Sequence, residues 1–400
     1  MRDFEYDVCT IGGGGHVGLP LSLLIASRGK KTCIYDVDIT NRDRIAQGIM
    51  PFREEGAQAL LQKTLQEGAF TVLKNPDMIS KSEIVIIVIG TPVDEFLNPR
   101  IGDIKRFFDS YMDYFVDGQL IILRSTIYPG TTEHIHQWFI KSGKKVDLAF
   151  CPERIAEGQA IPEMTQLPQI VSACTPEGEK RAKEFFSLLT PEIVLLNPQE
   201  AELGKLFINA WRYIQFSIAN QFFMIANDQK LDYYKIHEAI TYHYPRTQGL
   251  PKAGFTAGPC LFKDVMQLSS FYNNNFLLGH TAMLINEGFP DYLVQKLKNR
   301  MSLANKTVGI LGMAFKGGSD DKRGSLSYKL KKILEFECQK VLCTDPYIVH
   351  PDFVSFSEIV EQSDLLILAT PHEQYREVSF FSKPVIDIWN FYGSQGWKPI

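Results

Sequence analysis

Short apolar runs alternate with segments of helical periodicity through the first half of the chain. Five of these runs are typical of buried parallel strands: residues 6–11, 32–36, 84–89, 120–123 and 147–150. An apolar segment at residues 19–27 predicts a helix between the first two. Strands that alternate with helices are typical of a doubly wound α/β sheet. Because ligands of such sheets bind at the carboxyl ends of the strands, we expect the functional residues to follow these runs.

The pattern changes to helix between about residues 200 and 301. Residues 202–227 and 265–298 contain few helix breakers apart from Pro290, and each span exceeds the usual length of a globular helix. We interpret this segment as a connector that also makes subunit contacts. We therefore expect a homodimer.

The last hundred residues repeat the layout of the first. Residues 307–312 predict a strand with a glycine turn, residues 341–345 a strand that ends on an acid, and residues 364–369 and 385–388 two further strands. The sequence thus predicts an α/β protein with two Rossmann-like doubly wound domains joined by a central all-helical segment. We place the three domains at residues 1–199, 200–301 and 302–400.

The composition is that of an ordinary globular protein, with 45% hydrophobic residues, 22% charged residues and a net charge of −4. The absence of a Lys/Arg-rich run argues against nucleic acid and anionic membranes as partners, and no apolar string is long enough to cross a bilayer. The seven cysteines are scattered without a C-x-x-C pair, and the N-terminus does not resemble a secretory signal. We therefore expect the protein to reside in the reducing cytoplasm.

The histidines give no sign of a metal site. The eight of them make no zinc-type spacing with Cys or Glu, and His134 and His136 come nearest to one. We interpret that pair as a solvated helix edge, so the sequence predicts no bound metal.

A glycine motif of the type G-x-G-x-x-G follows the first predicted strand and opens the first predicted helix. Gly13 allows the tight turn, Gly15 lets the backbone approach a pyrophosphate, and Gly18 permits close packing of helix on strand. The amides near His16 and Val17 at the helix start would face the phosphate charge. In this context the motif predicts a dinucleotide cofactor.

An acid at the end of the second strand selects between the two nicotinamide cofactors. Asp36 can accept hydrogen bonds from a ribose 2′-hydroxyl and would repel a 2′-phosphate. NAD is therefore favoured over NADP, although the nearby Arg42 favours NADP weakly.

A thiol, an ammonium and a carboxylate lie within one turn near residue 260. Gly258-Pro259 before an apolar run predicts that a helix begins here, so Cys260 and Asp264 would lie four residues apart on one face. The helix dipole and Lys263 would favour the nucleophilic thiolate, and the carboxylate could manage the proton of an attacking water. The alternative is an inert buried cysteine in an amphipathic helix.

Six motifs in order along nearly the whole chain resemble the UDP-glucose/GDP-mannose dehydrogenase family of nucleotide-sugar 6-dehydrogenases. They are the glycine turn at 13–18; Ser125-Thr126 with residues 127–132; Pro152-Glu153-Arg154 with Glu157-Gly158; residues 201–206 with Asn209; Gly258-Pro259-Cys260 with Lys263-Asp264; and Ala314-Phe315-Lys316 with residues 320–323.

The resemblance implies an enzyme of polysaccharide biosynthesis that carries out a four-electron oxidation. Two NAD molecules would convert the C6 alcohol of a UDP-sugar to a carboxylate. The intermediate aldehyde would stay bound to Cys260 as a thiohemiacetal, a thioester would follow, and water would release the acid.

The resemblance also implies roles for individual residues. Lys205 and Asn209, four apart on one helix face, would stabilise the changing charge on the C6 oxygen, as an ammonium and an amide can. Asp264 would manage protons and water, and Glu153 would position or activate the hydrolytic water. The remaining residues would contact ligands: Thr126 and Glu157 near the nicotinamide; Thr91, Lys263 and Arg323 elsewhere on the cofactor; Lys316 at the substrate diphosphate; and Arg246, Phe255 and Gly258 at the sugar, Arg246 there or in the partner subunit's site.

The identity of the sugar stays open between two branches of the family. Residues 18–21 and 243–246 resemble the branch that oxidises UDP-N-acetylhexosamines, which favours UDP-N-acetylmannosamine or UDP-N-acetylglucosamine. The Lys263-Asp264 pair is similar to the UDP-glucose branch, which makes UDP-glucose the alternative substrate.

Two other functional classes also stay open. A two-electron dehydrogenase of the hydroxyacid type would share the NAD domain and the helical segment, but it has no need of Cys260 or of a third domain. A non-catalytic NAD-binding protein would keep the fold without the intact set of polar groups.

Overall fold

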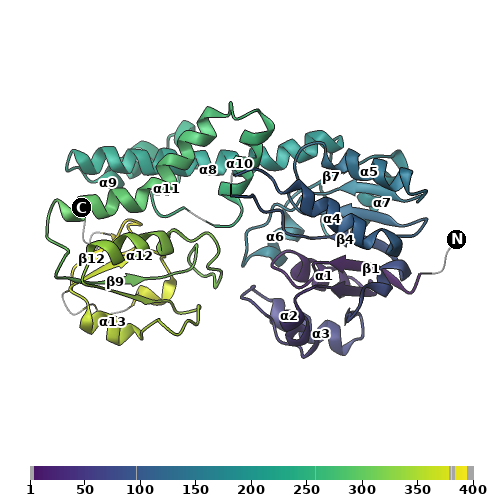
Figure 1. Cartoon of the computed structure of the whole chain (residues 1–400), viewed down its shortest axis with the longest axis horizontal. Coiled ribbons are helices and arrows are strands. Elements are labelled where there is room, and N and C mark those ends of the chain that lie inside the picture. The colour runs from purple at the N-terminus through teal and green to yellow at the C-terminus, as the bar shows by residue number, and fades with distance from the viewer. Residues whose placement is uncertain (1–3, 96, 257, 378–379, 381–382, 394–400) are drawn as a thin grey trace. The chain divides into compact units, whose positions relative to one another are not determined.

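The structure is a computed structural model that describes residues 4–95, 97–256, 258–377, 380 and 383–393 (Figure 1). The chain divides into two compact units, residues 1–208 and 209–400. The boundary lies inside α8 (Pro198–Asp228), a helix of 31 residues that confirms the long helix expected over 202–227. The three-domain division expected from the sequence stays a prediction.

The first unit contains one eight-stranded sheet with the order β3-β2-β1-β4-β5-β6-β7-β8. Neighbouring strands are parallel except for β6 and β7. The strands are β1 (Tyr6–Ile11), β2 (Thr32–Tyr35), β3 (Phe70–Val72), β4 (Ser82–Ile87), β5 (Leu120–Leu123), β6 (Asp147–Phe150), β7 (Gln169–Ala173) and β8 (Ile193–Leu195). All five predicted strands are present, and β3, β7 and β8 are additional.

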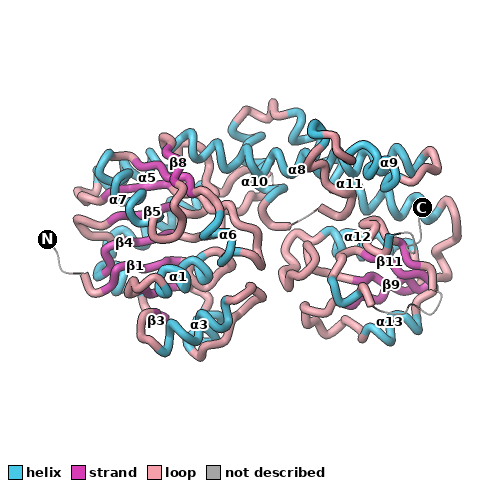
Figure 2. The backbone as a smooth tube through the Cα atoms, turned by 180° about the vertical axis from the view of Figure 1, so that it is seen from behind, coloured by secondary structure: helices cyan, strands magenta, loops and turns pink. Residues whose placement is uncertain are grey.

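Helices cover both faces of this sheet (Figure 2). They are α1 (Gly18–Ser27), α2 (Ile39–Ala46), α3 (Ala57–Gln66), α4 (Ile101–Tyr111), α5 (Thr131–Lys141), α6 (Ala160–Gln166) and α7 (Pro176–Phe186), with short 3₁₀ turns η1 (Pro76–Lys81) and η2 (Met112–Tyr114). Because side chains alternate along a strand, Val8 packs in the cluster that contains residues of α1 and α7, whereas Cys9 packs in the cluster with α4 and α5. The strands are therefore apolar on both sides.

The second unit contains a four-stranded parallel sheet with the order β10-β9-β11-β12, which confirms the second Rossmann-like domain. Its strands are β9 (Thr307–Leu311), β10 (Lys340–Thr344), β11 (Leu365–Leu368) and β12 (Val385–Ile386). Its helices are the later part of α8, α9 (Tyr233–Thr241), α10 (Leu261–Phe271), α11 (Leu277–Lys298), α12 (Leu326–Glu337) and α13 (Phe356–Gln362), with 3₁₀ turns η3 (Pro245–Thr247) and η4 (Glu373–Tyr375).

The single helix expected over 265–298 is wrong. The chain breaks between α10 and α11, where Asn273 and Asn274 have φ values of 52° and 59°. Asparagine tolerates this left-handed conformation better than most residues, so the Asn run ends one helix before the next begins. Pro290, in contrast, lies inside α11 without ending it.

Buried asparagines connect the helices of the second unit. Asn220 of α8 donates to the side-chain oxygen of Asn286 in α11 over 3.0 Å, and Asn286 donates to the carbonyl of Tyr213 over 3.1 Å. The backbone amide of Gly254 donates to Asn220 over 2.9 Å. Both asparagine side chains are fully buried, so this network fixes the segment that leads toward Cys260. Among the described helices, none combines the length and hydrophobicity that a membrane crossing needs.

Asp345, the acid that follows β10, is enclosed by donors. Its side chain accepts from the amides of Met313, Ala314, Tyr347 and Ile348 over 2.6 to 3.0 Å, and the ring of His372 lies 3.1 Å away. Burial acts to raise the pKa of Asp345, but His372 and the backbone amides lower it more, so the pKa lies below its ordinary value. The charged form therefore contributes stability.

We expect Asp345→Asn to lower the free energy of unfolding at pH 7 by at least about 1.5–3 kcal/mol, the value of one hydrogen bond to a charged group. Because the folded-state pKa is depressed, this contribution is present above the unfolded pKa of about 4 and is lost as the pH falls through the folded value. Urea unfolding at several pH values measures the difference, which should narrow below pH ~4. The exposed control Asp352→Asn should stay within about 0.5 kcal/mol of wild type, and an equal loss in both variants would contradict the prediction.

Candidate functional site

The glycine turn between β1 and α1 is shaped by close packing on two sides. A Cβ atom at Gly13 would lie 2.5 Å from the side chain of Ile34, and one at Gly18 would lie 2.5 Å from the carbonyl oxygen of Gly12. A Cβ at Gly15 would meet nothing closer than 3.8 Å. Packing therefore accounts for two of the glycines, whereas Gly15 leaves bare backbone against open space, as the approach of a pyrophosphate requires.

The start of α1 offers backbone donors without a competing acid. Val17 is the residue before the helix, no side chain caps it, and the first turn contains no acidic residue. The His16 ring lies against the Phe52 ring, tilted by 30°, with a centroid distance of 4.0 Å. The positive end of the helix dipole is thus left for an anion, so His16, Val17 and Gly18 fit the phosphates of NAD.

Asp36 lies at the carboxyl end of β2 and is held by two amides. Gly14 and Asp38 each donate to its carboxylate over 2.9 Å, and the residue is partly exposed. Arg42 donates to the carbonyl of Lys74 over 2.9 Å. The acid is therefore oriented and accessible for a ribose hydroxyl, while the guanidinium is directed at backbone. The turn and Asp36 together fit NAD.

The ends of β4 and β5 are joined by side-chain hydrogen bonds. The Thr91 hydroxyl donates to the carbonyl of Thr126 over 2.6 Å, and the Ser125 hydroxyl donates to the carbonyl of Ile89 over 2.7 Å. Two of the residues predicted to contact the cofactor, Thr91 and Thr126, thus lie together at the carboxyl edge of the sheet. Glu157 lies half-buried in the loop after β6, and Lys205 half-buried in α8.

Glu153 is held in an ion pair that the sequence analysis missed. Arg124, only 2% exposed, pairs with one carboxylate oxygen of Glu153 and donates to the Cys151 carbonyl and the Gln169 side chain over 2.8 Å each. The other oxygen of Glu153 accepts from the amides of Arg154 and Ile155. The carboxylate is therefore oriented at the end of β6. The available signal was an arginine that directly follows a buried strand.

A second buried acid, Glu202, fixes α8 to the start of α5. Glu202 accepts from the amide of Gly130, and from the amide and hydroxyl of Thr132 over 2.8 and 2.6 Å. Burial raises the pKa of Glu202, although these hydrogen bonds oppose the shift. Lys205 follows Glu202 by three residues in the same helix. The hydrogen bonds that hold Glu202 therefore also set the position of Lys205.

In the second unit, α10 begins directly after Cys260, as the sequence predicted. Cys260 is the residue before the helix, it is exposed, and its carbonyl accepts from the amide of Asp264 over 3.0 Å. The alternative of an inert buried cysteine is therefore wrong. An exposed thiol at the positive end of a helix dipole is a site where a thiolate is favoured.

Asp264, four residues after this thiol in the first turn of α10, is a fully buried carboxylate. Asn209 of α8 donates to one of its oxygens, and the ammonium of Lys263 lies 3.1 Å from the other. Lys263 was expected to support the thiolate, but its charge is shared with Asp264. Two of the residues predicted to be catalytic, Asn209 and Asp264, thus lie in direct contact.

The loop before Cys260 packs on the loop after β9. Gly258 has φ 117°, a Cβ there would lie 2.7 Å from the ring of Phe315, and its amide donates to the Gly324 carbonyl over 3.3 Å. Lys316 and Arg323 belong to that second loop. Arg323 donates through Nε and Nη2 to both oxygens of Asp321. The structure thus brings the predicted diphosphate and cofactor residues of this loop beside the cysteine segment.

Two predicted sugar contacts lie elsewhere in the unit. Phe255 is buried in the core, edge-on to Phe289 with a centroid distance of 5.8 Å. Arg246 is exposed in η3 and lies 5.7 Å from the Tyr244 ring. The side chain of Phe255 is therefore part of the core packing, and the side chain of Arg246 lies at the surface.

Three sequence models of one protein family match the chain in order. Residues 7–190 match the NAD binding domain of the UDP-glucose/GDP-mannose dehydrogenase family, residues 199–287 its central domain, and residues 309–394 its UDP binding domain.

Relatives agree with these matches. The UDP-N-acetyl-D-mannosamine dehydrogenase of Pyrococcus horikoshii is 28% identical over 381 residues, covering 92% of this chain and 90% of the relative. A solved structure of UDP-D-ManNAc dehydrogenase from the same organism superposes with a TM-score of 0.86 at 27% identity, covering 93% and 91% of the two chains. A UDP-glucose dehydrogenase structure from Pyrobaculum islandicum has a TM-score of 0.87 at 24% identity, over 97% and 95%, and shows the shared fold.

We expect Arg124→Met to destabilise the protein by about 3–5 kcal/mol, because it leaves the Glu153 carboxylate buried without its partner. The double variant Arg124→Met/Glu153→Gln should recover part of that stability but not turnover, since the oriented carboxylate is absent. Thermal unfolding and steady-state NADH formation measure the two effects. The exposed control Arg106→Met should cost less than about 1 kcal/mol. Full activity in the double variant would show that Glu153 has no role in the reaction.

Proposed function

Because the chain belongs to the UDP-glucose/GDP-mannose dehydrogenase family and is an NAD-dependent nucleotide-sugar dehydrogenase, we propose that it oxidises the C6 alcohol of a UDP-N-acetylhexosamine to the uronate. UDP-N-acetylmannosamine is the favoured substrate, because relatives named for that activity match over nearly the full chain. The observation that carries the four-electron reaction is the exposed Cys260 thiol at the start of α10, with the buried carboxylate of Asp264 one turn later.

Cys260 would hold the substrate between the two oxidation stages. Its thiolate adds to the C6 aldehyde, so that a C–S bond forms, the carbonyl π bond breaks and the oxygen becomes an oxyanion. NAD, when bound, supplies the hydride acceptor for each stage. After the second stage the carbon is a thioester of Cys260. Attack of water then breaks the C–S bond, which gives the carboxylate and returns the thiol.

The groups around Cys260 suit the charge changes of this scheme. An asparagine amide has two N–H donors, so Asn209 can hold Asp264 with one and the C6 oxygen with the other. We assign Lys205, one turn earlier in α8, to the same oxygen. Asp264 would accept the proton of the C6 alcohol, and Glu153, oriented by Arg124, would activate the hydrolytic water.

Cofactor and sugar contacts follow from the same assignment. The glycine turn, with His16 and Val17, would hold the NAD pyrophosphate, and Asp36 the adenosine ribose. Five further residues would contact the cofactor: Thr91, Thr126, Glu157, Lys263 and Arg323. Arg246, Phe255 and Gly258 would shape the sugar site, Phe255 by supporting its wall from the core.

Lys316 would bind the substrate diphosphate. In the first unit the acid after the second strand is accessible, whereas Asp345, its counterpart, already accepts from the amides of its own glycine turn at Met313 and Ala314. The amides of Met313 and Ala314 are therefore engaged by the protein itself. Lys316, just after the turn, offers a side-chain cation for the phosphates.

The alternatives are weaker on specific grounds. A hydroxyacid-type dehydrogenase has no need of the UDP binding domain that residues 309–394 match, nor of an exposed Cys260. A non-catalytic NAD-binding protein would not require a buried Asp264 held by two polar side chains. UDP-glucose stays the alternative substrate.

Assembly and location follow from surface and thiol chemistry. Five large apolar side chains on α8, each between 37% and 60% exposed, lie within a 60° arc of an ideal helix and form the α8 stripe: Phe207, Trp211, Ile218, Phe222 and Ile225. Such a contiguous exposed surface marks a contact with another protein, so we propose a homodimer through α8.

The state of the cysteines bears on the compartment. All seven are described and remain thiols, which suits the cytoplasm.

We expect two NADH per uronate from wild-type enzyme, with the highest kcat/KM for UDP-N-acetylmannosamine in a panel that includes UDP-N-acetylglucosamine, UDP-glucose and GDP-mannose. Cys260→Ala should form no acid while binding NAD normally, because the aldehyde then has no thiol to add to it. The control Cys338→Ala changes another thiol away from α10 and should keep full turnover. One NADH per sugar with an active Cys260→Ala variant would contradict the four-electron reaction and favour the two-electron dehydrogenase.

We expect Trp211→Glu/Phe222→Glu to shift the protein toward a monomer of 45.5 kDa, since each carboxylate would have to be buried in the interface. Sedimentation velocity at micromolar concentration measures the change. Phe336→Glu places the same charge on an aromatic position that is 90% exposed outside the stripe, and it should leave the dimer intact. A wild-type protein that sediments as a monomer would rule the proposal out.

A further inference from the structure

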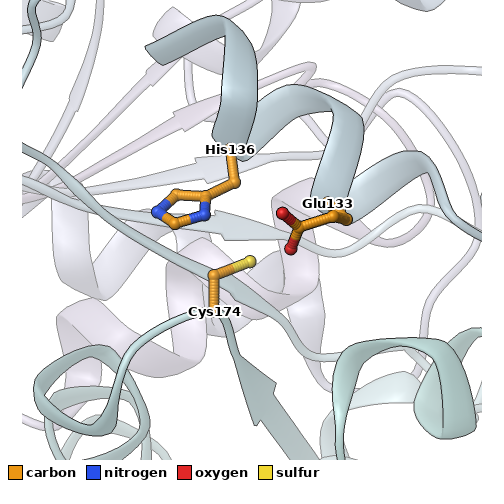
Figure 3. Close-up of side chains that lie close together, drawn as sticks. All are labelled: Glu133, His136 and Cys174. Atoms are coloured by element: carbon orange, nitrogen blue, oxygen red, sulfur yellow. The ribbon is translucent and has the colours of Figure 1, made fainter. Parts of the chain in front are cut away.

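Three side chains that could bind a metal meet in the first unit, and none of them is assigned a role above. Glu133 and His136 project from α5, and Cys174 follows β7 (Figure 3). One potential ligand atom from each lies within 4.8 Å of the others. The sequence predicted no metal here, because Cys174 lies 38 residues after His136 and no short motif connects them.

The backbone that carries these side chains is fixed by the core. Ile135 and Phe139 of α5 are buried in the cluster beneath the helix. β7 pairs antiparallel with β6, and the amide of Cys174 donates to the Leu148 carbonyl over 2.9 Å. The three positions are therefore held together without a metal, which lowers the ordering cost of binding one.

The chemistry of the three side chains is complementary to a cation. Glu133 and His136 are three residues apart on one helix face, and neither nitrogen of the His136 ring hydrogen-bonds to any described residue. Cys174 is half-buried, and the exposed Glu133 carboxylate accepts one hydrogen bond, from the side-chain amide of Gln137 over 2.8 Å. The cluster thus offers a carboxylate oxygen, an imidazole nitrogen and a thiol sulfur close enough to share one ion.

We propose that Glu133, His136 and Cys174 bind a divalent ion of the zinc type, with water as the fourth ligand. Thiolate, imidazole and carboxylate are the ligands that Zn²⁺ prefers in a tetrahedral site, whereas Ca²⁺ and Mg²⁺ select oxygen. Binding replaces the thiol proton with a metal–sulfur bond and releases the proton to solvent. The ion would connect α5 to β7 and stabilise the first unit.

The site lies next to a functional segment of the chain. α5 begins at Thr131, five residues after Thr126, and Glu202 caps the start of α5 from the helix that carries Lys205. Occupancy would therefore restrain the loop of residues 124–130. We expect a stability effect first, because none of the three ligands is assigned to the reaction.

Cobalt(II) titration of the metal-depleted full-length enzyme tests the proposal. Co²⁺ bound to a thiolate gives a charge-transfer absorption, and Zn²⁺ should displace it. Wild type and Cys260→Ser should each bind one equivalent with this absorption, and Cys174→Ser should lose it. His136→Ala and Glu133→Gln should weaken binding by about 100-fold or more, since loss of even an outer-shell partner costs about 10–100-fold.

Matched controls separate this site from other thiols and imidazoles. His134→Ala removes the neighbouring histidine of α5, whose Nδ1 hydrogen-bonds to the carbonyl oxygen of Gly130. Cys338→Ser removes another half-buried thiol. Both should bind cobalt as wild type does. Zn²⁺ should raise the melting temperature of wild type but not of Cys174→Ser. Loss of the absorption in Cys260→Ser with retention in Cys174→Ser would overturn the proposal, as would no uptake at micromolar metal.

Discussion

The buried carboxylate of Asp264 is the constraint on which the second unit depends. A fully buried charge is costly unless polar groups surround it, and losing one partner of a buried ion pair costs about 3–5 kcal/mol. Here Asn209 donates from α8 and Lys263 pairs from the same turn, so α8 and α10 must keep their positions for the charge to be tolerated. The Asn220–Asn286 hydrogen bond holds α8 against α11, and Asn220 also accepts from Gly254 in the segment before Cys260. The position of the exposed thiol is therefore set by the buried polar groups of α8, α10 and α11.

The two Rossmann-like sheets show how one local layout serves two purposes. Both have a strand, a glycine turn, a helix and a second strand that ends on aspartate. Asp36 accepts from two amides and stays accessible. Asp345 accepts from four amides and contacts His372, and it is enclosed. One acid is left for a ligand and the other completes the fold. The difference supports our proposal that the first turn binds the cofactor pyrophosphate and that Lys316 binds the substrate diphosphate.

Local features of the fold could be predicted from the sequence, and long-range ones could not. The apolar runs at 6–11 and 120–123 became β1 and β5, because burial on both faces imposes their composition. The start of α10 at Cys260 was readable from Gly-Pro. The Arg124–Glu153 pair and the Glu133, His136 and Cys174 cluster join residues that sheet topology brings together across 29 to 41 positions. The helix break at Asn273 was missed because no Gly or Pro marks it.

The environments of the other cysteines also support the assignment of Cys260 as the nucleophile. All seven cysteines are described, and Cys260 alone among them is exposed. Burial raises the pKa of Cys151 and Cys343 to about 12 and that of Cys338 to about 11, which keeps these thiols protonated and unreactive near neutral pH. A nucleophile must instead meet solvent and substrate, and it gains from the positive end of a helix. Cys260 meets both requirements at the first turn of α10. This contrast supports our proposal that Cys260 is the thiol that forms the covalent intermediate.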